Sequence, residues 1–385
     1  MLIIGGGIGG LTSALCLAHF GIKSTIFERA AGLEEVGAGI QLSPNAMRVM
    51  QRLGLEDAII AAGCLPRAAQ IRDGINGTVL ATNRLGDTAL SRYGAPYVHI
   101  HRADLVGILA TALDQRQPGA LRLQHRISAI RQNSERVELD IGKNSIAGDL
   151  LIGADGMHSI VRATWATSEP PRYSGHTAWR FTAPTTALGR DAPLPAATVW
   201  VGDHQHAVTY NVRGGALTNF VGVVEAPLAG QEDWSATGSR AELRAAFGGW
   251  HRTISRMIDT ADSFNRWPLF DRPPLAHFHD HHIVLVGDAA HPMLPFLAQG
   301  AAQAIEDSYV LAQQLASTPD ISTALAAYSA QRVERTVRVQ RASVALADIY
   351  HRRPTALAVA AKPLATRIMG KQFDWLYGHD VTTPD

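Results

Sequence analysis

The fold of this chain is decided by residues 1–29, which read MLIIGGGIGGLTSALCLAHFGIKSTIFER. The apolar run Leu2–Ile4 predicts a first strand, and Gly5, Gly7 and Gly10 follow it in G-x-G-x-x-G spacing. The first glycine allows a tight turn, the second lets a pyrophosphate approach because it has no Cβ, and the third lets helix and strand pack closely. The spacing therefore predicts a strand–turn–helix unit that binds the phosphates of a dinucleotide.

The residues after this turn support the same interpretation. A helix is predicted because apolar residues recur at helical intervals, at Ile8, Leu11, Leu15 and Ala18. Such a helix directs free N–H groups and the positive end of its dipole toward the phosphates. A second strand over residues 22–27 ends on Glu28, where a carboxylate accepts hydrogen bonds from a ribose diol. This context favours a dinucleotide site over an ordinary glycine-rich turn, but it does not distinguish NAD from FAD.

Length and composition restrict the class of protein. A chain of 385 residues exceeds the usual size of one hydrophobic core, so we expect two domains. The net charge of +1 gives no reason to expect a nucleic acid or an acidic membrane as partner. No apolar run reaches the ~18 residues of a membrane span, and two cysteines, Cys16 and Cys64, fit a reducing compartment. We expect a cytoplasmic protein with no integral membrane segment.

Two separate segments of the chain have a β-like pattern that differs from the first domain. Residues 67–97 contain the hairpin signals Asp73-Gly74 and Asn76-Gly77. Residues 173–225 show several short alternating runs, and a helical stretch follows over 240–260. The predicted organisation is a first domain of residues 1–67, 98–170 and 268–345, a β-rich domain of residues 68–97 and 171–267, and a C-terminal helical segment of residues 346–385.

A second candidate site lies far along the chain. The stretch HIVLVGDAAHP, residues 282–292, predicts a buried strand that ends at Gly287 and Asp288. A long helix is predicted from Gln299, and Gly300 at its start exposes N–H groups that suit an anion. An aspartate after a strand can take hydroxyl groups, and a helix start can face a ring edge that becomes anionic on reduction. The two features together suit a flavin.

Other residues could complete such a site. Arg102 stands at the start of a helix predicted over residues 99–113, where a cation is unfavourable beside the positive end of the dipole. A cofactor phosphate and a surface salt bridge are equally good partners for Arg102 on the residues alone. The glycine-rich passage 37–45 is interpreted as a second backbone surface beside the cofactor, with a plain loop before a helix as the alternative.

Three separated motifs agree in order and spacing: residues 5–10 with Glu28, residues 153–156, and residues 287–292. Together they resemble the single-component (class A) FAD-dependent aromatic monooxygenases of the para-hydroxybenzoate hydroxylase class. The resemblance extends from residue 1 to about 345 and is closest to the salicylate, 3-hydroxybenzoate and 6-hydroxynicotinate hydroxylases. It implies an α/β fold, with a Rossmann-like FAD-binding domain, an inserted β-sheet substrate domain and C-terminal helices.

The resemblance also implies which residues contact FAD. The pyrophosphate would lie on the first glycine turn, the adenosine beside the end of the second strand, the ribityl chain near Asp288, and the isoalloxazine near the start of the long helix. Asp155 would serve both FAD and the nicotinamide donor. The full implied set of cofactor contacts is Gly7, Ile8, Gly9, Glu28, Arg29, Gln41, Arg102, Ile127, Asp155, Asp288, Gly300 and Ala301.

The activity implied by the resemblance is hydroxylation of a small aromatic or N-heteroaromatic ring. NADH or NADPH, as a transient co-substrate, would reduce FAD, and O₂ would then give a flavin C4a-hydroperoxide that the ring attacks. A base is expected near the substrate because deprotonation of a ring hydroxyl raises the electron density of the ring. His206 and Tyr210 match pocket positions of the 6-hydroxynicotinate hydroxylases and are the predicted catalytic residues. His204 is expected to share their face, and a solvent-facing histidine cluster is the alternative.

Several alternatives stay open. Gln41 and Phe296 stand where the 6-hydroxynicotinate enzyme has histidines, which suggests a less polar substrate. A flavin-dependent epoxidase or a ubiquinone-pathway hydroxylase with a larger substrate, or a non-oxygenating dinucleotide-binding protein, is possible on the sequence. No metal is predicted, because the run His277, His279, His281 and His282 has no carboxylate or cysteine partners and fits an exposed loop. The protein is expected to be a monomer or a homodimer.

Overall fold

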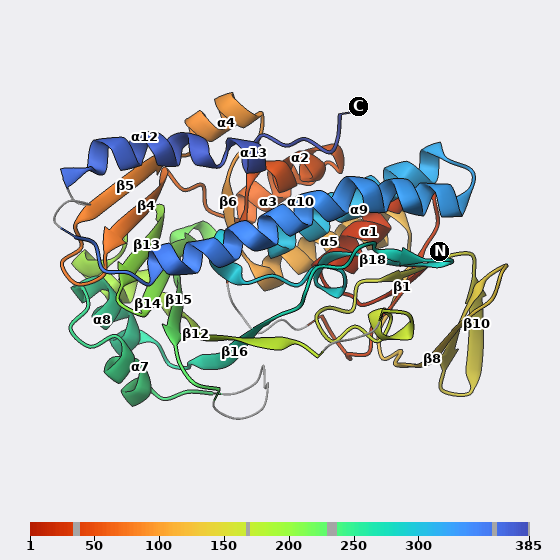
Figure 1. The fold of residues 1–385 in the computed structure, drawn as a ribbon, viewed down its shortest axis with the longest axis horizontal. Coiled ribbons are helices and arrows are strands. Elements are labelled where there is room, and N and C mark those ends of the chain that lie inside the picture. Colours follow the sequence, from red (N-terminus) through yellow and green to blue (C-terminus); the bar gives the residue numbers. More distant parts are fainter. Residues whose placement is uncertain (34–38, 167–169, 229–236, 356–359, 384–385) are drawn as a thin grey trace.

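The computed structural model describes residues 1–33, 39–166, 170–228, 237–355 and 360–383. A mostly parallel sheet with helices forms one half of the molecule, and a seven-stranded sheet forms the other (Figure 1). This architecture confirms the predicted α/β fold class. In the described part of the chain, no helix has both the length and the apolar character needed to cross a membrane.

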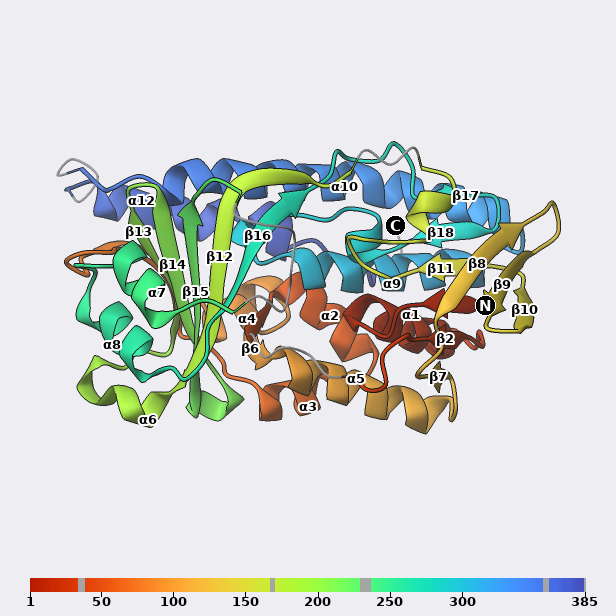
Figure 2. The same ribbon diagram turned by 90° about the horizontal axis from the view of Figure 1, so that it is seen from below.

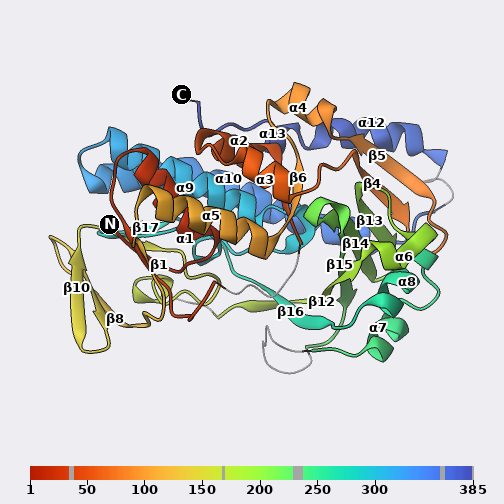
Figure 3. The same cartoon turned by 180° about the vertical axis from the view of Figure 1, so that it is seen from behind.

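The first half is built on a six-stranded sheet with the order β17-β18-β11-β1-β2-β7. All neighbouring strands pair in parallel except β17 and β18. Helix α1 (Ile8–His19) packs against both α5 (Arg102–Arg116) and α9 (Gly300–Ser317), as Figure 3 shows from behind. The strands are β1 (Leu2–Ile4), β2 (Thr25–Phe27), β7 (Leu121–Arg122), β11 (Leu151–Gly153), β17 (His279–Asp280) and β18 (Ile283–Leu285).

The glycine turn between β1 and α1 has the geometry that its spacing predicts. Gly5 has a φ of +108°, and a Cβ there would lie 2.4 Å from the carbonyl oxygen of Ala154. A Cβ on Gly10 would lie 1.9 Å from the carbonyl oxygen of Gly5. A Cβ on Gly7, by contrast, would meet no atom within 4 Å. The first and third glycines are therefore needed by the fold, and the second leaves open space in front of the helix.

The second half is built on a seven-stranded sheet with the order β16-β12-β15-β14-β13-β4-β5. Neighbours are antiparallel except β13 and β4, which pair in parallel and join the two separate chain segments. This arrangement agrees with a β-rich unit made from two segments, whose boundaries stay a prediction. The strands are β4 (Ala68–Asp73), β5 (Val79–Arg84), β12 (Arg172–Pro184), β13 (Ala196–Gly202), β14 (Gln205–Val212), β15 (Leu217–Glu225) and β16 (Asn265–Asp271).

The two faces of this sheet have different partners. One face packs aromatic side chains such as Phe181 and Phe220 against α7 (Arg240–Ala246) and α8 (Arg252–Thr260), seen from below in Figure 2. The other face packs against Phe296 and the end of α10. Helix α10 (Ile321–Tyr350) runs along both halves of the molecule (Figure 2). The second face of the sheet therefore lies toward the cofactor half.

The remaining elements are small. Strands β3 and β6 form a two-stranded ribbon, and β8, β9 and β10 form a three-stranded sheet at the far end from the seven-stranded one (Figure 3). They are β3 (Gly39–Leu42), β6 (Val98–His101), β8 (Ile127–Gln132), β9 (Val137–Ile141), β10 (Asn144–Gly148), and the helices α2 (Pro44–Arg52), α3 (Glu56–Ala62), α4 (Asp87–Tyr93), α6 (Thr185–Leu188), α12 (Lys362–Gln372) and α13 (Asp374–Tyr377).

Some local predictions are wrong. Residues 98–101 form strand β6, so the predicted helix begins only at Arg102. The run from His158 to Arg162 also predicts the start of a helix, but the structure has a single 3₁₀ turn there, Arg162–Thr164, and the Asp155 side chain accepts a hydrogen bond from the Ile160 N–H at 2.7 Å. The predicted β-like segment, residues 67–97, contains the helix α4. This helix ends at Gly94, which has a left-handed backbone conformation. Residues 37 and 38 of the glycine-rich passage, which is predicted to lie beside the cofactor, are outside the described residues.

Candidate active site

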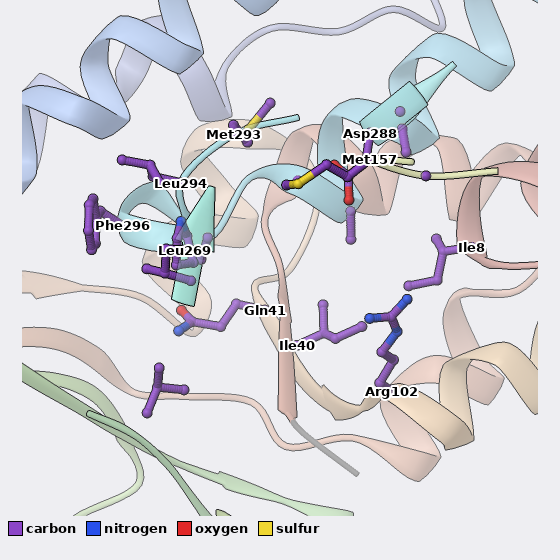
Figure 4. Close-up of a pocket in the computed structure, with 18 of the residues that line it drawn as sticks. Ile8, Ile40, Gln41, Arg102, Met157, Leu269, Asp288, Met293, Leu294 and Phe296 are labelled. Atoms are coloured by element: carbon purple, nitrogen blue, oxygen red, sulfur yellow. The ribbon is translucent and has the colours of Figure 1, made fainter. Parts of the chain in front are cut away.

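One cavity of about 320 Å³ lies between the glycine turn and the seven-stranded sheet. Figure 4 shows Ile8, Arg102 and Asp288 around one end and Leu294 and Phe296 around the other. The polar end is formed where strands β1 and β18 end and where helices α5 and α9 begin. These four elements lie far apart in sequence. In open α/β sheets ligands bind at such strand and helix ends, so this end is the candidate cofactor site.

Asp288 is the most informative residue of the polar end. It follows β18 in a 3₁₀ turn, and Gly287 before it has a φ of +58°. Burial raises the pKa of the Asp288 carboxyl, although His291 and Arg102 act in the opposite direction. None of the described residues contributes a hydrogen bond to this shift. A carboxylate held in a cavity without donors is suited to the hydroxyl groups of a bound molecule.

The backbone around Asp288 offers complementary donors. Gly300 is the first residue of α9, and Ala301 follows it in the cavity wall. Gly7 and Gly9 line the same cavity at the start of α1. Two helix starts with free N–H groups favour negative charge, and the open space at Gly7 admits a phosphate. The residues of this end therefore fit a dinucleotide that carries both hydroxyl groups and phosphates.

The apolar end of the cavity is formed by the seven-stranded sheet. His206, Val208 and Tyr210 alternate along β14, so all three side chains face the cavity. His206 is 2% exposed and Tyr210 is 3% exposed. The Tyr210 ring lies against strand β3 of the two-stranded ribbon, and a Cβ on Gly39 of that strand would be 2.4 Å from the ring. Leu269, Leu294 and Phe296 complete a wall suited to a flat ring.

A cation also faces this end. Arg180 lies on β12, and its guanidinium is stacked 4.9 Å from the ring centroid of Trp267. Its buried Nε has no hydrogen-bond partner among the described residues. Burial lowers the pKa of Arg180, and the charged groups that act on it are Tyr210 and Arg102, with no carboxylate in the described surroundings. The cavity thus contains a positive charge that a bound anion could satisfy.

Comparison with known proteins identifies this architecture. The family described as "FAD binding domain" matches residues 1–343. The 3-amino-4-hydroxybenzoate 2-monooxygenase of Streptomyces cremeus is 37% identical over 387 residues, which cover 100% of this chain and 96% of the relative. This chain belongs to the FAD-dependent aromatic hydroxylases.

One further relative and one solved structure support the assignment. The 6-hydroxynicotinate 3-monooxygenase of Bordetella bronchiseptica is 36% identical and covers 89% of each chain. The crystal structure of Klebsiella pneumoniae HpxO complexed with FAD and uric acid has a TM-score of 0.82 at 27% identity, and covers 98% of this chain and 93% of that one. Both comparisons cover at least 89% of this chain.

The structure brings most of the predicted hydroxylase residues together. The cavity is lined by ten of them: Gly7, Ile8, Gly9, Gln41, Arg102, His206, Tyr210, Asp288, Gly300 and Ala301. Gln41 accepts a hydrogen bond from the Tyr97 hydroxyl at 2.9 Å. Their contacts with FAD or substrate stay predictions, since proximity alone does not assign a role.

Four predicted cofactor residues lie outside the cavity wall. Glu28 accepts hydrogen bonds from the N–H groups of Gly6 at 2.7 Å and Ala30 at 2.8 Å, so it stands beside the glycine turn. Arg29 is exposed next to it. Asp155 accepts from the Ser159 hydroxyl at 2.6 Å, and burial raises the pKa of its carboxyl. Ile127 is buried at the start of β8.

The prediction that His204 shares the face of His206 and Tyr210 is wrong. His204 lies in the turn between β13 and β14 with a φ of +60°, so the strand alternation that would align it with His206 does not reach it. Its side chain is 80% exposed and lies 2.7 Å from Glu225. The solvent-facing alternative therefore applies to His204 but not to His206.

Sequence reasoning missed two residues near the substrate end. Arg180 interrupts the apolar sequence Trp179-Arg180-Phe181, and a charge within a strand of aromatic residues was an available signal. His351 lies 145 residues from His206 and gave no local signal, yet their rings hydrogen-bond. Within the described residues, one group has the spacing of metal ligands: His176, Glu225 and His351, with ligand atoms within 4.8 Å of one another. The absence of a metal stays a prediction.

Proposed function

We propose that this protein hydroxylates a small aromatic or heteroaromatic acid that carries a ring hydroxyl, with FAD as cofactor and NADH or NADPH and O₂ as co-substrates. FAD supplies the redox chemistry that activates O₂. Membership of the FAD-dependent aromatic hydroxylases supports this general activity. The carboxylate of the substrate is inferred from Arg180, whose buried charge faces the cavity without a described carboxylate partner.

The chain's own residues would divide the work along the cavity. Gly7 and Gly9 would approach the pyrophosphate, Asp288 would accept from the ribityl hydroxyls, and Gly300 would present backbone to the flavin ring. At the other end, Arg180 would bind the carboxylate in a bidentate manner. His206 would accept the proton of the ring hydroxyl. The aromatic and aliphatic wall would exclude water from the reacting ring.

The size of the cavity favours compact substrates. The cavity of about 320 Å³ includes both the residues proposed to hold FAD and the wall of the seven-stranded sheet, so the flavin would fill part of it and leave limited room for the substrate. A ubiquinone-pathway substrate or another lipid-like molecule would need a longer apolar path. The names of the two relatives also refer to ring acids with a hydroxyl group. A single aromatic ring with a carboxylate is therefore the substrate class that we propose.

Arg180→Met is expected to raise the KM for an aromatic acid about tenfold to thirtyfold, as for loss of a charged hydrogen bond worth ~1.5–2 kcal/mol. The carboxamide of the same compound should bind the variant and the wild type equally. The measurement is substrate-dependent NAD(P)H oxidation, with hydroxybenzoates, aminohydroxybenzoates and hydroxynicotinates as probes and product identified by mass.

Arg266→Met is the matched control for this experiment. Arg266 lies on the neighbouring strand and is likewise stacked on a tryptophan, Trp179, at 5.5 Å, but it pairs with Glu242 outside the cavity. It should leave the KM unchanged. If Arg180→Met and Arg266→Met give the same KM for the acid, the proposed carboxylate site is wrong, although the hydroxylase activity would stand.

A further inference from the structure

A continuous chain of hydrogen bonds leads from the cavity to the surface. The Nδ1 atom of His206 lies 2.8 Å from Nε2 of His351. The Nδ1 atom of His351 lies 2.9 Å from Oε1 of Glu225, and the other oxygen of Glu225 lies 2.7 Å from Nδ1 of His204. Side-chain exposure rises along this path, from 3% at His351 to 43% at Glu225 and 80% at His204.

The backbone fixes each member of this chain. His206 and Glu225 lie on the paired strands β14 and β15, and His351 follows the last residue of α10. The His204 N–H donates to the carbonyl of His351 at 2.9 Å, and the Glu225 N–H donates to the carbonyl of His204 at 2.9 Å. Helix end, hairpin turn and strand end are therefore tied together, which brings the backbones of these residues close to one another.

Apolar rings surround the inner part of the path. The ring centroids of Phe296 and Tyr350 lie 5.3 Å and 5.2 Å from that of His206. Because the His206 Nδ1 is engaged by His351, its Nε2 is the nitrogen that remains for a molecule in the cavity. A proton accepted there has a hydrogen-bonded route to water that does not require water to enter the cavity.

The electrostatics of His206 favour such a route. Burial lowers the pKa of His206 well below its ordinary value, and His351 and His176 lower it further. An isolated imidazole of this kind would not retain the proton of a ring hydroxyl. Glu225 has the opposite character, since hydrogen bonds from His204 and His351 lower the pKa of its carboxyl although burial opposes them. The other titratable groups facing the path are His176, Tyr350, Asp203 and Asp348.

We propose that His206, His351 and Glu225 form a proton relay that carries the ring-hydroxyl proton of the substrate to solvent. The proposal rests on the proposed function, because it needs a hydroxylated aromatic substrate in the cavity. His206 touches the substrate in this scheme, whereas His351 and Glu225 act through it as positioning residues.

The relay conserves protons in both directions. The substrate O–H bond breaks as His206 Nε2 gains a proton, and His206 Nδ1 passes its own proton to His351 Nε2. His351 Nδ1 passes its proton to Glu225 Oε1, and Glu225 releases one proton to water or through His204. The net change is a substrate phenolate and one solvent proton. When the product is reprotonated, each transfer reverses and the original tautomers return.

The test measures proton release directly. FAD-loaded, oxidised enzyme in weak buffer is mixed in a stopped-flow instrument with a hydroxylated aromatic acid and a pH-indicator dye, below the pKa of the free hydroxyl. Wild-type enzyme should release up to one proton per bound substrate. His351→Gln and Glu225→Gln should slow the release at least tenfold while the substrate Kd changes less than threefold. Imidazole added to the solution should restore the rate in Glu225→Gln.

The controls separate the possible failures. His279→Gln changes a histidine of β17, on the six-stranded sheet of the other half of the molecule and away from the hydrogen-bonded path, and it should leave the rate unchanged. Glu225→Gln removes a half-exposed side chain, so it provides a folded variant if His351→Gln does not fold. Unchanged release rates in Glu225→Gln, or wild-type binding without proton release, would overturn the relay. If no aromatic acid binds or stimulates NAD(P)H oxidation, the proposed function fails and the relay with it.

Discussion

Arg332→Met is expected to lower the free energy of unfolding by about 3–5 kcal/mol, because it leaves buried Asp307 without its arginine and removes one of the two arginines that pair with buried Glu306. Arg332 on α10 is 1% exposed. Its Nη1 atom lies 2.5 Å from Oε2 of Glu306, and its Nε lies 2.7 Å from Oδ1 of Asp307. Both carboxylates belong to α9 and have no exposed side-chain surface. Methionine fills a similar volume but cannot compensate either charge.

The effect should extend to the candidate cofactor site. Asp307 also accepts a hydrogen bond from the Gly287 N–H at 2.9 Å, and it lies 2.5 Å from Nε2 of His291. These contacts fix the turn that presents Asp288 to the cavity. Loss of Arg332 would therefore loosen that turn as well as destabilise the packing of α9 on α10.

The pH dependence of this effect has a definite sign. Burial raises the pKa of Glu306, but Arg332 and Arg335 together outweigh it and hold the pKa well below its ordinary value. The ionised carboxylate therefore stabilises the wild type above the unfolded pKa of ~4.3, and this contribution is lost as the pH falls. Without Arg332 only Arg335 opposes burial at Glu306, so the pKa rises and the variant should lose less stability at pH 5 than at pH 8.

Urea and thermal unfolding of the apoprotein at pH 5 and pH 8 would measure the loss in the free energy of unfolding caused by Arg332→Met. Arg341→Ala is the matched control, because Arg341 is an exposed arginine on the same helix. It should change the free energy of unfolding by less than about 0.5 kcal/mol. A loss below about 1 kcal/mol in Arg332→Met at pH 8 would contradict the argument.

The parts of the fold that the sequence predicted are those with local constraints. Gly10 is required by a contact with Gly5 in the same turn, and Gly5 is favoured by its own φ of +108°, so their spacing alone identifies the turn. The strand before Asp288 is apolar because both of its faces are buried, and this pattern is also local. The site at the polar end could be assembled from such signals because each contributing segment ends a strand or begins a helix.

The parts that could not be predicted depend on tertiary placement. His351 joins His206 only because α10 ends beside the β13–β14 hairpin, and nothing in either segment indicates this. His204 was misplaced because a positive φ in a two-residue turn breaks strand alternation. Arg332, a buried cation, resembles any arginine of a long helix until Glu306 and Asp307 are known to lie opposite it.

Asp288→Ala is expected to weaken FAD binding at least about a hundredfold, or ~2.7 kcal/mol, because the proposed acceptor for the ribityl hydroxyls is lost. Charge-assisted hydrogen bonds contribute ~1.5–3 kcal/mol each, so one or two such bonds account for this loss. The purified variant should lose its yellow colour on gel filtration. Equilibrium titration of the apoprotein with FAD, followed by flavin fluorescence, would give the dissociation constant.

The stability of the apoprotein distinguishes this effect from misfolding. Asp288 is solvent-exposed in the open cavity and accepts no described hydrogen bond, so its removal takes no packing or hydrogen bond from the apoprotein. The apo form of Asp288→Ala should therefore melt at the same temperature as the wild-type apoprotein, although it binds FAD poorly. Asp288→Asn, which keeps one acceptor oxygen without the charge, should give an intermediate loss of affinity.

The pH dependence of FAD binding provides a second, independent measurement. Hydroxyl donors favour the ionised carboxylate, so FAD binding should lower the pKa of Asp288 from its raised value. Wild-type affinity should then fall as the pH drops through that raised pKa, while the affinity of Asp288→Asn should stay nearly constant over the same range. Normal flavin content in Asp288→Ala, or parallel pH profiles in wild type and Asp288→Asn, would remove Asp288 from the cofactor site.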